Sequence, residues 1–307
     1  MPPAVEPPTI ARIVVTDEEW ASGRLSKSNI EKGVVALAED GVVILENAIP
    51  DSVIDPLNKR MTADAKYLRS APGTQFNYDT KAQNILQHMP ASPEYIFPVI
   101  QTNPFALAIC KAVLGPKPVL RYHKANTNFP GESRQPVHGD VHYEHPRVCF
   151  ALAVNAALID CGPENGSTEL WPGTHLKTCF KDQNGMKGIF PHLLEERTNS
   201  FGGPVQPSIK KGGLLIRDMR LWHAGMPNRT KEEVRVMLNL IYFADWYRNV
   251  MKIKFPRASE EKIQQLEREG EIEVAAEYLD EVDHLTLRHT HDFAQDDKRE
   301  EWGRNRE

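Results

Sequence analysis

Two histidines and one aspartate, found in two short stretches of the sequence, have the residue types and spacing of a metal site. The first stretch is Gln135-Pro-Val-His138-Gly-Asp140, and the second is Trp222-His223-Ala-Gly. In an extended strand, side chains two residues apart point to the same face, so His138 and Asp140 can reach one ion together. Two imidazoles and one carboxylate on one face of a metal are the ligands of non-haem Fe(II) sites, and they leave coordination positions open.

A zinc site built from His138, His142 and His145 is the alternative for the first stretch. His138 and His142 are four residues apart, a spacing that places two ligands on one face of a helix. The flanking prolines and Gly139 disfavour a helix there, and Gly139 stands where the H-E-x-x-H motif carries glutamate. The residues therefore favour iron.

Arg235 begins a predicted strand over residues 234–243, in which alternation places Met237 and Asn239 on the same face. An arginine in so apolar a strand needs an anionic partner, because a buried unpaired charge is strongly destabilising. The distal carboxylate of a dicarboxylic acid could supply that partner through two parallel hydrogen bonds, and a protein carboxylate is the alternative. Arg229, in a polar loop, is a weaker candidate for the same role.

The elements that must position these residues are a helical start followed by strands. Helices are predicted over residues 26–39, 50–69 and 105–114, with a short buried strand over 42–45. From residue 119 the apolar period changes to two, and strands are predicted over 119–124, 148–158, 214–217 and 234–243. This order indicates a mainly β fold with flanking helices, such as a sandwich or jelly roll.

The composition divides the chain into three segments. Residues 1–9 are rich in proline and are predicted to be disordered, residues 10–257 form the β domain with its helices, and residues 258–307 form a charged, helical C-terminal extension. An apolar stripe in this extension either docks on the domain's own sheet or forms a dimer contact; its members are Ile263, Leu266, Val274, Tyr278 and Val282. Residues 71–103 are predicted to be an irregular segment or lid rather than scaffold.

The overall composition argues against several classes of partner. The 307 residues carry a formal net charge of -5, which gives no sign of nucleic-acid binding by bulk electrostatics. No apolar run approaches the roughly 18 residues of a membrane helix, and the N-terminus lacks the pattern of a secretory signal. The 4 cysteines form no C-x-x-C pair and suggest free thiols. We expect an intracellular, cytoplasmic protein with no membrane or nucleic-acid partner.

These motifs resemble those of the phytanoyl-CoA dioxygenase family of Fe(II)- and 2-oxoglutarate-dependent oxygenases. The resemblance covers roughly residues 28–247, and the chain looks most like the fungal branch that modifies natural products such as meroterpenoids and alkaloids. The matching elements are Gln135-x-x-His138-x-Asp140, then Pro163-Glu-Asn-Gly-Ser-Thr168-Glu-Leu-Trp-Pro-Gly-Thr-His175, then His223-Ala-Gly with Arg235.

The resemblance implies a double-stranded β-helix, a cupin-like jelly roll with the metal at one open end. It implies that Fe(II) is bound by His138, Asp140 and His223. It also implies that 2-oxoglutarate is held at its C5 carboxylate by Arg235, with further contacts from Gln135, Thr168 and the weaker candidate Asn84. The turn that ends at His175 is interpreted as scaffold, because its glycine permits a tight turn and its polar side chains can satisfy backbone groups.

The implied reaction consumes O2 and 2-oxoglutarate and releases succinate and CO2. It oxidises a small organic molecule by hydroxylation, desaturation or a related reaction. The expected setting is secondary metabolite biosynthesis. The carboxylate of Asp140 favours oxygenation, because related halogenases carry a small residue in its place. One alternative is an acyl-CoA substrate, recognised by a basic patch of Lys177, Lys210 and Lys211. Another is a non-catalytic jelly-roll binding protein, and a homodimer stays open. Candidate pocket residues are Phe76, Tyr78, Phe129 and His142.

Overall fold

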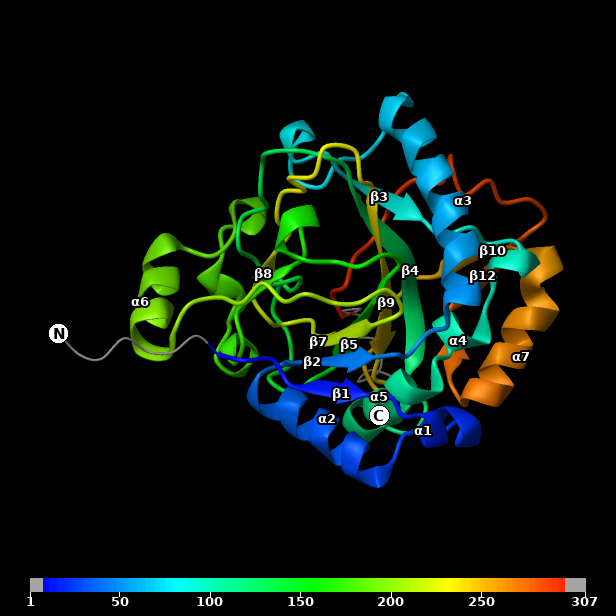
Figure 1. The fold of residues 1–307 in the computed structure, drawn as a ribbon, viewed down its shortest axis with the longest axis horizontal. Helices are drawn as coiled ribbons and strands as arrows, with labels where there is room; N and C mark the ends of the chain where they lie inside the picture. Colours follow the sequence, from blue (N-terminus) through cyan, green and yellow to red (C-terminus); the bar gives the residue numbers. More distant parts are fainter. Residues whose placement is uncertain (1–7, 296–307) are drawn as a thin grey trace, which may run out of the picture.

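The computed structural model describes residues 8–295, and at its centre lies a mixed sheet of eight strands (Figure 1). Its neighbouring strands are, in spatial order, β1 (Arg12–Val14), β2 (Val42–Glu46), β7 (Leu214–Asp218), β5 (Ala151–Ala157), β9 (Arg235–Phe243), β4 (Val119–Asn128) and β11 (Glu273–Val274), and β3 (Asn84–His88) also pairs with β4. The pairs β1–β2 and β4–β11 are parallel, and the others are antiparallel.

A second, much shorter sheet completes the predicted jelly roll. It consists of β6 (Glu169–Leu170) and β8 (His223–Ala224), which pair antiparallel. Single bridges extend it, including one between His138 and His223 and one between Leu170 and Val205. The predicted strands around residues 119, 148, 214 and 234 correspond to β4, β5, β7 and β9 of the main sheet.

Helices surround the main sheet (Figure 1). They are α1 (Asp17–Ser22), α2 (Lys27–Glu39), α3 (Asp51–Ser70), α4 (Pro98–Gln101), α5 (Pro104–Leu114), α6 (Pro191–Phe201) and α7 (Glu260–Gly270), and a separate strand pair joins β10 (Ile253–Pro256) to β12 (Ala276–Leu279). The Ser26 side chain caps α2 by accepting from the backbone of Asn29. Within residues 8–295, no helix combines the length and the apolar composition that crossing a bilayer requires.

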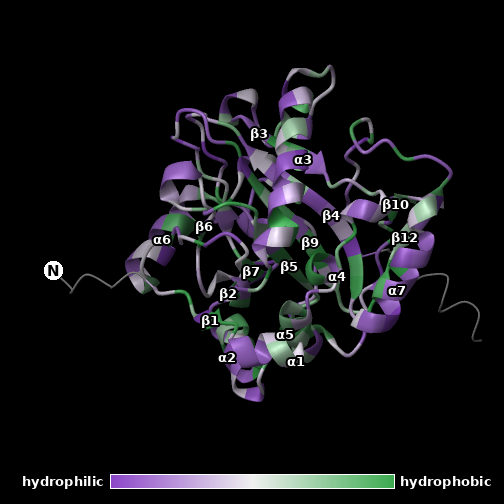
Figure 2. Ribbon diagram, turned by 45° about the vertical axis from the view of Figure 1, so that its right-hand side comes forward, coloured by the Kyte–Doolittle hydropathy of each residue, from purple (hydrophilic) through white to green (hydrophobic). Residues whose placement is uncertain are grey.

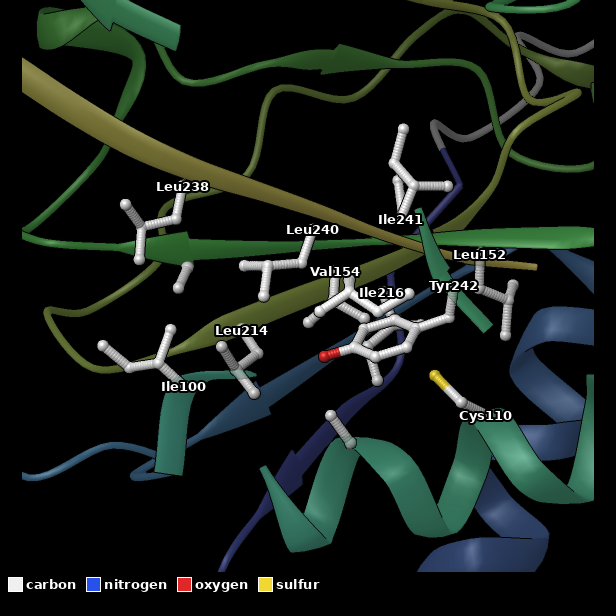
Figure 3. Close-up of a cluster of buried hydrophobic side chains, with 14 of the residues drawn as sticks. Ile100, Cys110, Leu152, Val154, Leu214, Ile216, Leu238, Leu240, Ile241 and Tyr242 are labelled. Atoms are coloured by element: carbon white, nitrogen blue, oxygen red, sulfur yellow. The ribbon is translucent and has the colours of Figure 1, made fainter. Parts of the chain in front are cut away.

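The main core lies between this sheet and its covering helices. Tyr242 of β9, Leu152 of β5 and Ile216 of β7 face Cys110 of α5 (Figure 3). The Tyr242 hydroxyl is buried and donates to the carbonyl of Gln101 at 2.7 Å, so its burial leaves no unpaired donor. Figure 2 shows the inner strands as mainly hydrophobic and the outer helices as largely hydrophilic. Each large apolar side chain that is fully buried stabilises the folded state by roughly 1.5–3 kcal/mol.

The prediction of an irregular segment over residues 71–103 was wrong for β3, which is an edge strand of the main sheet. The alternation of apolar and polar residues that would predict β3 is absent from the sequence, because buried polar residues replace apolar ones. Gln87 donates to the carbonyl of Met61 at 2.9 Å and accepts from the hydroxyl of Thr127 at 2.7 Å. A polar side chain whose hydrogen bonds are all satisfied can be buried at little cost, and the hydrophobic periodicity then disappears.

The C-terminal extension, predicted to be helical from residue 258, is helical only in part, since α7 ends at Gly270 and two strands follow. Ile263, Leu266 and Val274 of the apolar stripe are buried in the main core, so the stripe docks on its own domain. The predicted disorder over residues 1–9 and the end of the charged extension fall largely on residues 1–7 and 296–307, which lie outside the described residues.

Gly41 couples the first strands to the turn that ends at His175. It has a φ of +75°, its carbonyl accepts from the backbone of Asp218 at 2.9 Å, and a Cβ there would lie 2.5 Å from Nδ1 of His175. Gly173 in the same turn donates its N–H to Asp40 at 2.8 Å. The turn is therefore scaffold, as its sequence predicts.

We expect Gly41→Ala to lower the free energy of unfolding by about 1–2 kcal/mol from the left-handed backbone and by a further ~1–3 kcal/mol from the clash. Gly23→Ala is the matched control, because Gly23 has a φ of +62° with open space around it and should lose only the first part. Urea titration measures both losses. Equal losses in the two variants would show that His175 moves aside freely.

Candidate metal centre

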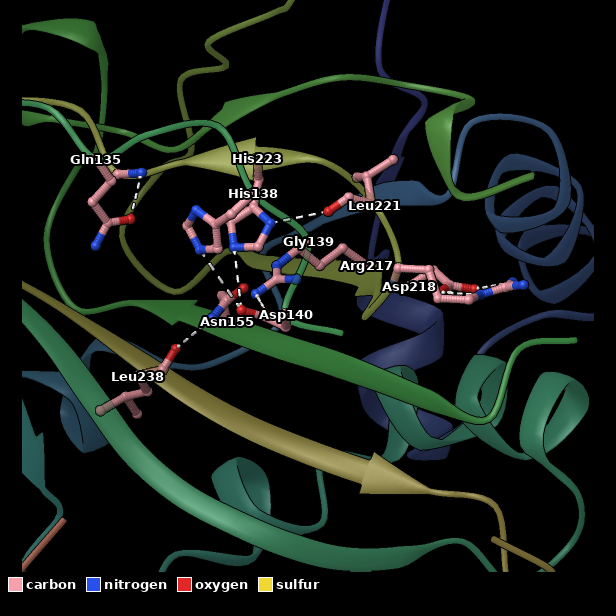
Figure 4. Close-up of polar contacts among 12 residues, drawn as sticks. Gln135, His138, Gly139, Asp140, Asn155, Arg217, Asp218, Leu221, His223 and Leu238 are labelled. Carbon is pink, nitrogen blue, oxygen red and sulfur yellow. Dashed lines mark hydrogen bonds and ion pairs between the residues drawn. The ribbon is translucent and has the colours of Figure 1, made fainter. Parts of the chain in front are cut away.

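His138, Asp140 and His223 converge beside one cavity (Figure 4). Their candidate ligand atoms all lie within 4.8 Å of one another, and within residues 8–295 theirs is the one such group. Nε2 of His138 and Nε2 of His223 lie 3.8 Å and 3.6 Å from Oδ1 of Asp140, too far for hydrogen bonds and close enough to share an ion. The zinc alternative with His142 and His145 is not assembled.

The backbone holds the two histidines in place. The N–H of His138 donates to the carbonyl of His223 at 2.9 Å, and the N–H of His223 donates back at 2.8 Å. Each Nδ1 donates to a carbonyl two residues earlier, to Pro136 at 2.8 Å and to Leu221 at 3.0 Å. These hydrogen bonds leave the lone pair on each Nε2, which therefore faces Asp140 as a potential ligand.

The protonation states also suit a cation. Burial lowers the pKa of both His138 and His223, so the imidazoles are neutral at physiological pH. Burial alone would raise the pKa of Asp140, but the charge and hydrogen bond of Arg217 hold it well below its usual range. Two neutral nitrogens and one carboxylate form a donor set that fits Fe(II).

Arg217 is a site residue that we did not predict from the sequence. It lies on β7, is buried, and donates from Nη2 to Oδ2 of Asp140 at 2.6 Å, while its Nη1 has no hydrogen-bond partner within residues 8–295. The pairing orients the carboxylate so that Oδ1 faces the histidines (Figure 4). The signal was available, because Arg217, like Arg235, is an arginine inside an apolar strand.

Arg235 lies in the same cavity and has no carboxylate partner among residues 8–295. Its Nη2 and Nη1 donate to the carbonyls of Gly166 at 2.8 Å and Asn126 at 3.3 Å, and its buried Nε has no partner. Burial lowers its pKa from the usual value, which marks a charge held without compensation. Met237 and Asn239 line the cavity beside it, as alternation predicts. This orphaned guanidinium fits an anionic ligand.

The remaining predicted residues also line this cavity, whose volume is about 530 Å³; they are Gln135, Thr168 and Asn84. Gln135 has a second task, because its Oε1 accepts from the backbone of Gly225 at 2.8 Å, next to His223. Residues that sequence reasoning missed line it too; they include Tyr122, Asn126, Asn155, His291 and Phe293. The last two come from the C-terminal segment, which was predicted to be a charged extension.

Three of the four candidate pocket residues line the cavity. They are Phe76, Tyr78 and His142, and the ring of Tyr78 lies 5.0 Å from that of His138. Phe129 instead packs against Leu68 and Ile85. The lysines that might bind coenzyme A do not line it; Lys210 pairs with Asp160 at 2.7 Å, and Lys211 pairs with Asp51 and Asp55 at 3.0 Å each.

Residues 37–237 match the model of the family described as phytanoyl-CoA dioxygenase (PhyH). The chain belongs to this family. The membership confirms the predicted enzyme class, a non-haem Fe(II)- and 2-oxoglutarate-dependent dioxygenase, because the match spans both stretches that carry the triad and the arginine.

Two curated fungal proteins are similar to this chain. Dioxygenase andF of Emericella variicolor is 25% identical over 221 residues, which span 66% of this chain and 70% of the relative. Dioxygenase af480 of Aspergillus fumigatus is 28% identical over 166 residues, which span 52% of this chain and half (50%) of the relative. Both support the predicted resemblance to the fungal branch.

Solved structures confirm the fold. The non-haem α-ketoglutarate-dependent epimerase SnoN from nogalamycin biosynthesis has a TM-score of 0.54 and 17% identity, covering 71% of this chain and 84% of its own. EctD from S. alaskensis, solved with 2-oxoglutarate and 5-hydroxyectoine, has a TM-score of 0.52 and 22% identity, covering 72% of this chain and 76% of its own. The predicted double-stranded β-helix is therefore correct.

We expect Arg217→Gln to weaken Fe(II) binding by about 10–100-fold, because Asp140 loses the partner that orients and ionises it. Arg220→Gln is the matched control, since Arg220 is equally buried but pairs with Asp218, at 2.7 Å, instead of a metal ligand. Competition with a chromophoric Fe(II) chelator measures both affinities. An equal loss in the two variants would assign Arg217 to general stability alone.

Proposed function

We propose that His138, Asp140 and His223 bind Fe(II) and that Arg235 binds the C5 carboxylate of 2-oxoglutarate. One observation carries the proposal: the triad lines the same cavity as a buried guanidinium that has no carboxylate partner among residues 8–295. Dicarboxylate binding would give Arg235 the short, charge-assisted hydrogen bonds that it lacks among the described residues.

The other cavity residues then have supporting roles. The Thr168 hydroxyl and the amides of Gln135 and Asn84 line the same space and can contact 2-oxoglutarate. Oδ1 of Asn239 has no hydrogen-bond partner among the described residues and can accept a hydrogen bond from a bound molecule or water. Tyr78 packs beside His138 and helps to exclude water from the metal.

When bound, iron with 2-oxoglutarate and O2 supplies the power to oxidise an unactivated C–H bond, while 2-oxoglutarate leaves as succinate and CO2. The chain contributes positioning and exclusion of water. Because Asp140 occupies the third ligand position with a carboxylate, oxygenation is favoured over halogenation. The place of the substrate above the metal decides between hydroxylation, desaturation, epoxidation and rearrangement.

The substrate that we propose is a small organic molecule of secondary metabolism. The fungal dioxygenases andF and af480 support this class, as does an epimerase of nogalamycin biosynthesis. The acyl-CoA alternative loses its candidate basic patch, because Lys210 and Lys211 form ion pairs away from the cavity. A homodimer and a cytoplasmic location stay predictions, which sedimentation and cell fractionation would test.

We expect anaerobic titration with Fe(II) and 2-oxoglutarate to give the weak visible absorption band of a keto acid bound to ferrous iron, and we expect His223→Ala to abolish it. His142→Ala is the matched control, because His142 lines the cavity outside the triad and should keep the band. Loss of metal binding in His142→Ala with retention in His223→Ala would instead support the zinc site.

We expect Arg235→Met to weaken 2-oxoglutarate binding by about 30-fold or more, as removal of one partner of a buried charge pair costs roughly 2–5 kcal/mol. Arg229→Met is the control, since Arg229 is exposed in its loop and should bind 2-oxoglutarate like the wild type. Calorimetric titration of the Mn(II)-loaded protein measures both without turnover. Unchanged affinity in Arg235→Met would place the distal carboxylate elsewhere.

A further inference from the structure

A second cavity of about 840 Å³ adjoins the first and shares Tyr122, His291 and Asp292 with it. Part of its wall is apolar, contributed by Met89, Ala91, Val250, Met251 and Ile253. The two cavities together offer room for a molecule much larger than 2-oxoglutarate. The second cavity contains none of the proposed iron or 2-oxoglutarate residues, so its chemistry is not explained by the proposed function.

Lys124 of β4 is a buried charged residue that lines this second cavity. It is only 6% exposed, and its Nζ is buried without a hydrogen-bond partner among residues 8–295. Its Nζ lies over the ring of Tyr122, 5.0 Å from the ring centroid. Burial lowers the pKa of Lys124 to about 8, so the ammonium group is still mainly charged at neutral pH. A buried, uncompensated ammonium group is costly and calls for an anion.

Two histidines add further donors beside Lys124. His88 lies opposite Lys124 in the β3–β4 register, so the two side chains share a face of the sheet. The ring of His88 stacks on that of His289, with 4.4 Å between the ring centroids. The buried Nε2 of His88 and Nδ1 of His289 have no hydrogen-bond partner in the described part of the chain. Burial, reinforced by Lys124, lowers the pKa of His88 to about 2 and that of His289 to about 4, so both rings are neutral.

We propose that Lys124, with His88 and His289, binds a carboxylate of the substrate, so that the substrate is an organic acid with an apolar body. The apolar body would pass Tyr122 into the first cavity, where the metal centre lies. This inference rests on the proposed function of that centre. Among the described charged residues that line this cavity, Lys124 alone is buried. Its single ammonium group, with two neutral rings beside it, matches the one charge of a carboxylate. The other charged lining residues are Arg121, Lys252, Lys254, Glu277, Arg288 and Asp292.

The first test uses two fluorescent probes and the purified protein without added metal. The anionic probe is 1-anilinonaphthalene-8-sulfonate, and N-phenyl-1-naphthylamine has the same rings without the charge. We expect Lys124→Met to lower the affinity for the anionic probe by at least about tenfold and to leave the affinity for the neutral probe unchanged. Lys252→Met is the matched control, because Lys252 lines the same cavity but is exposed, and should bind both probes like the wild type.

Displacement of the anionic probe then identifies the anion. Octanoate should displace it from the wild type far better than octanamide, and the advantage should disappear in Lys124→Met. Unchanged binding of the anionic probe in Lys124→Met, or an equal loss of both probes, would overturn the proposal. Displacement by octyl phosphate but not by octanoate would overturn the carboxylate assignment.

Stability and metal chemistry separate this proposal from simpler explanations. If Lys124 serves a ligand, Lys124→Met should unfold at the same or a higher temperature than the wild type, since it removes an unpaired buried charge. A clearly lower unfolding temperature would assign Lys124 a structural role and sink the inference. The keto-acid band should persist in Lys124→Met. If the wild type itself shows no band, the iron proposal is refuted. The probe results then decide by themselves whether Lys124 binds a carboxylate.

Discussion

The reciprocal pair of backbone hydrogen bonds between residues 138 and 223 is the constraint on which the site depends. The second sheet is too short to hold these segments by an extended ladder, since β8 contains only 2 residues. Side chains and turns reinforce it instead. The hydroxyl of Thr174 accepts from the backbone of Trp222 at 3.0 Å, and Gln135 binds the backbone of Gly225. The backbone hydrogen bonds thus fix the positions of the two imidazoles. The turn over residues 172–175 supports the metal ligand His223 but contributes no ligand itself.

Around this frame, buried positive charge exceeds what the nearby carboxylates compensate. Asp140 pairs with Arg217, whereas Arg235 and Lys124 have no ion-pair partner among residues 8–295. Such charges are costly in the free protein, and each is relieved when an anion binds. The proposed ligands would therefore stabilise the fold as well as react in it, by the usual linkage between binding and unfolding. Ligand-free protein should be the least stable form of this domain.

The sequence predicted the parts whose signal is local. Residues 138 and 140 share a strand face, and the apolar alternation around residues 119, 151, 214 and 235 marks the main strands. It did not predict β3, because Gln87 satisfies its polar groups inside the fold and interrupts the apolar pattern. Nor could it place His291 and Phe293 in the cavity, because both rings contact Tyr122 of β4, far away in the sequence, and that contact depends on the tertiary fold. Arg217 was missed although its signal matched that of Arg235.

One face of the main sheet packs against helices and the other lines the cavity, and this arrangement explains how the domain tolerates so polar a cavity. In β9, Leu238, Leu240 and Tyr242 belong to the core that packs against α5, while Met237 and Asn239 face the cavity (Figure 3). Burial on the helix-covered face supplies most of the stabilising apolar contact. The cavity face is then free to carry amides and unpaired cations, each of which costs stability where it stands. Substitutions on that face can change what is bound while the packed face preserves the fold.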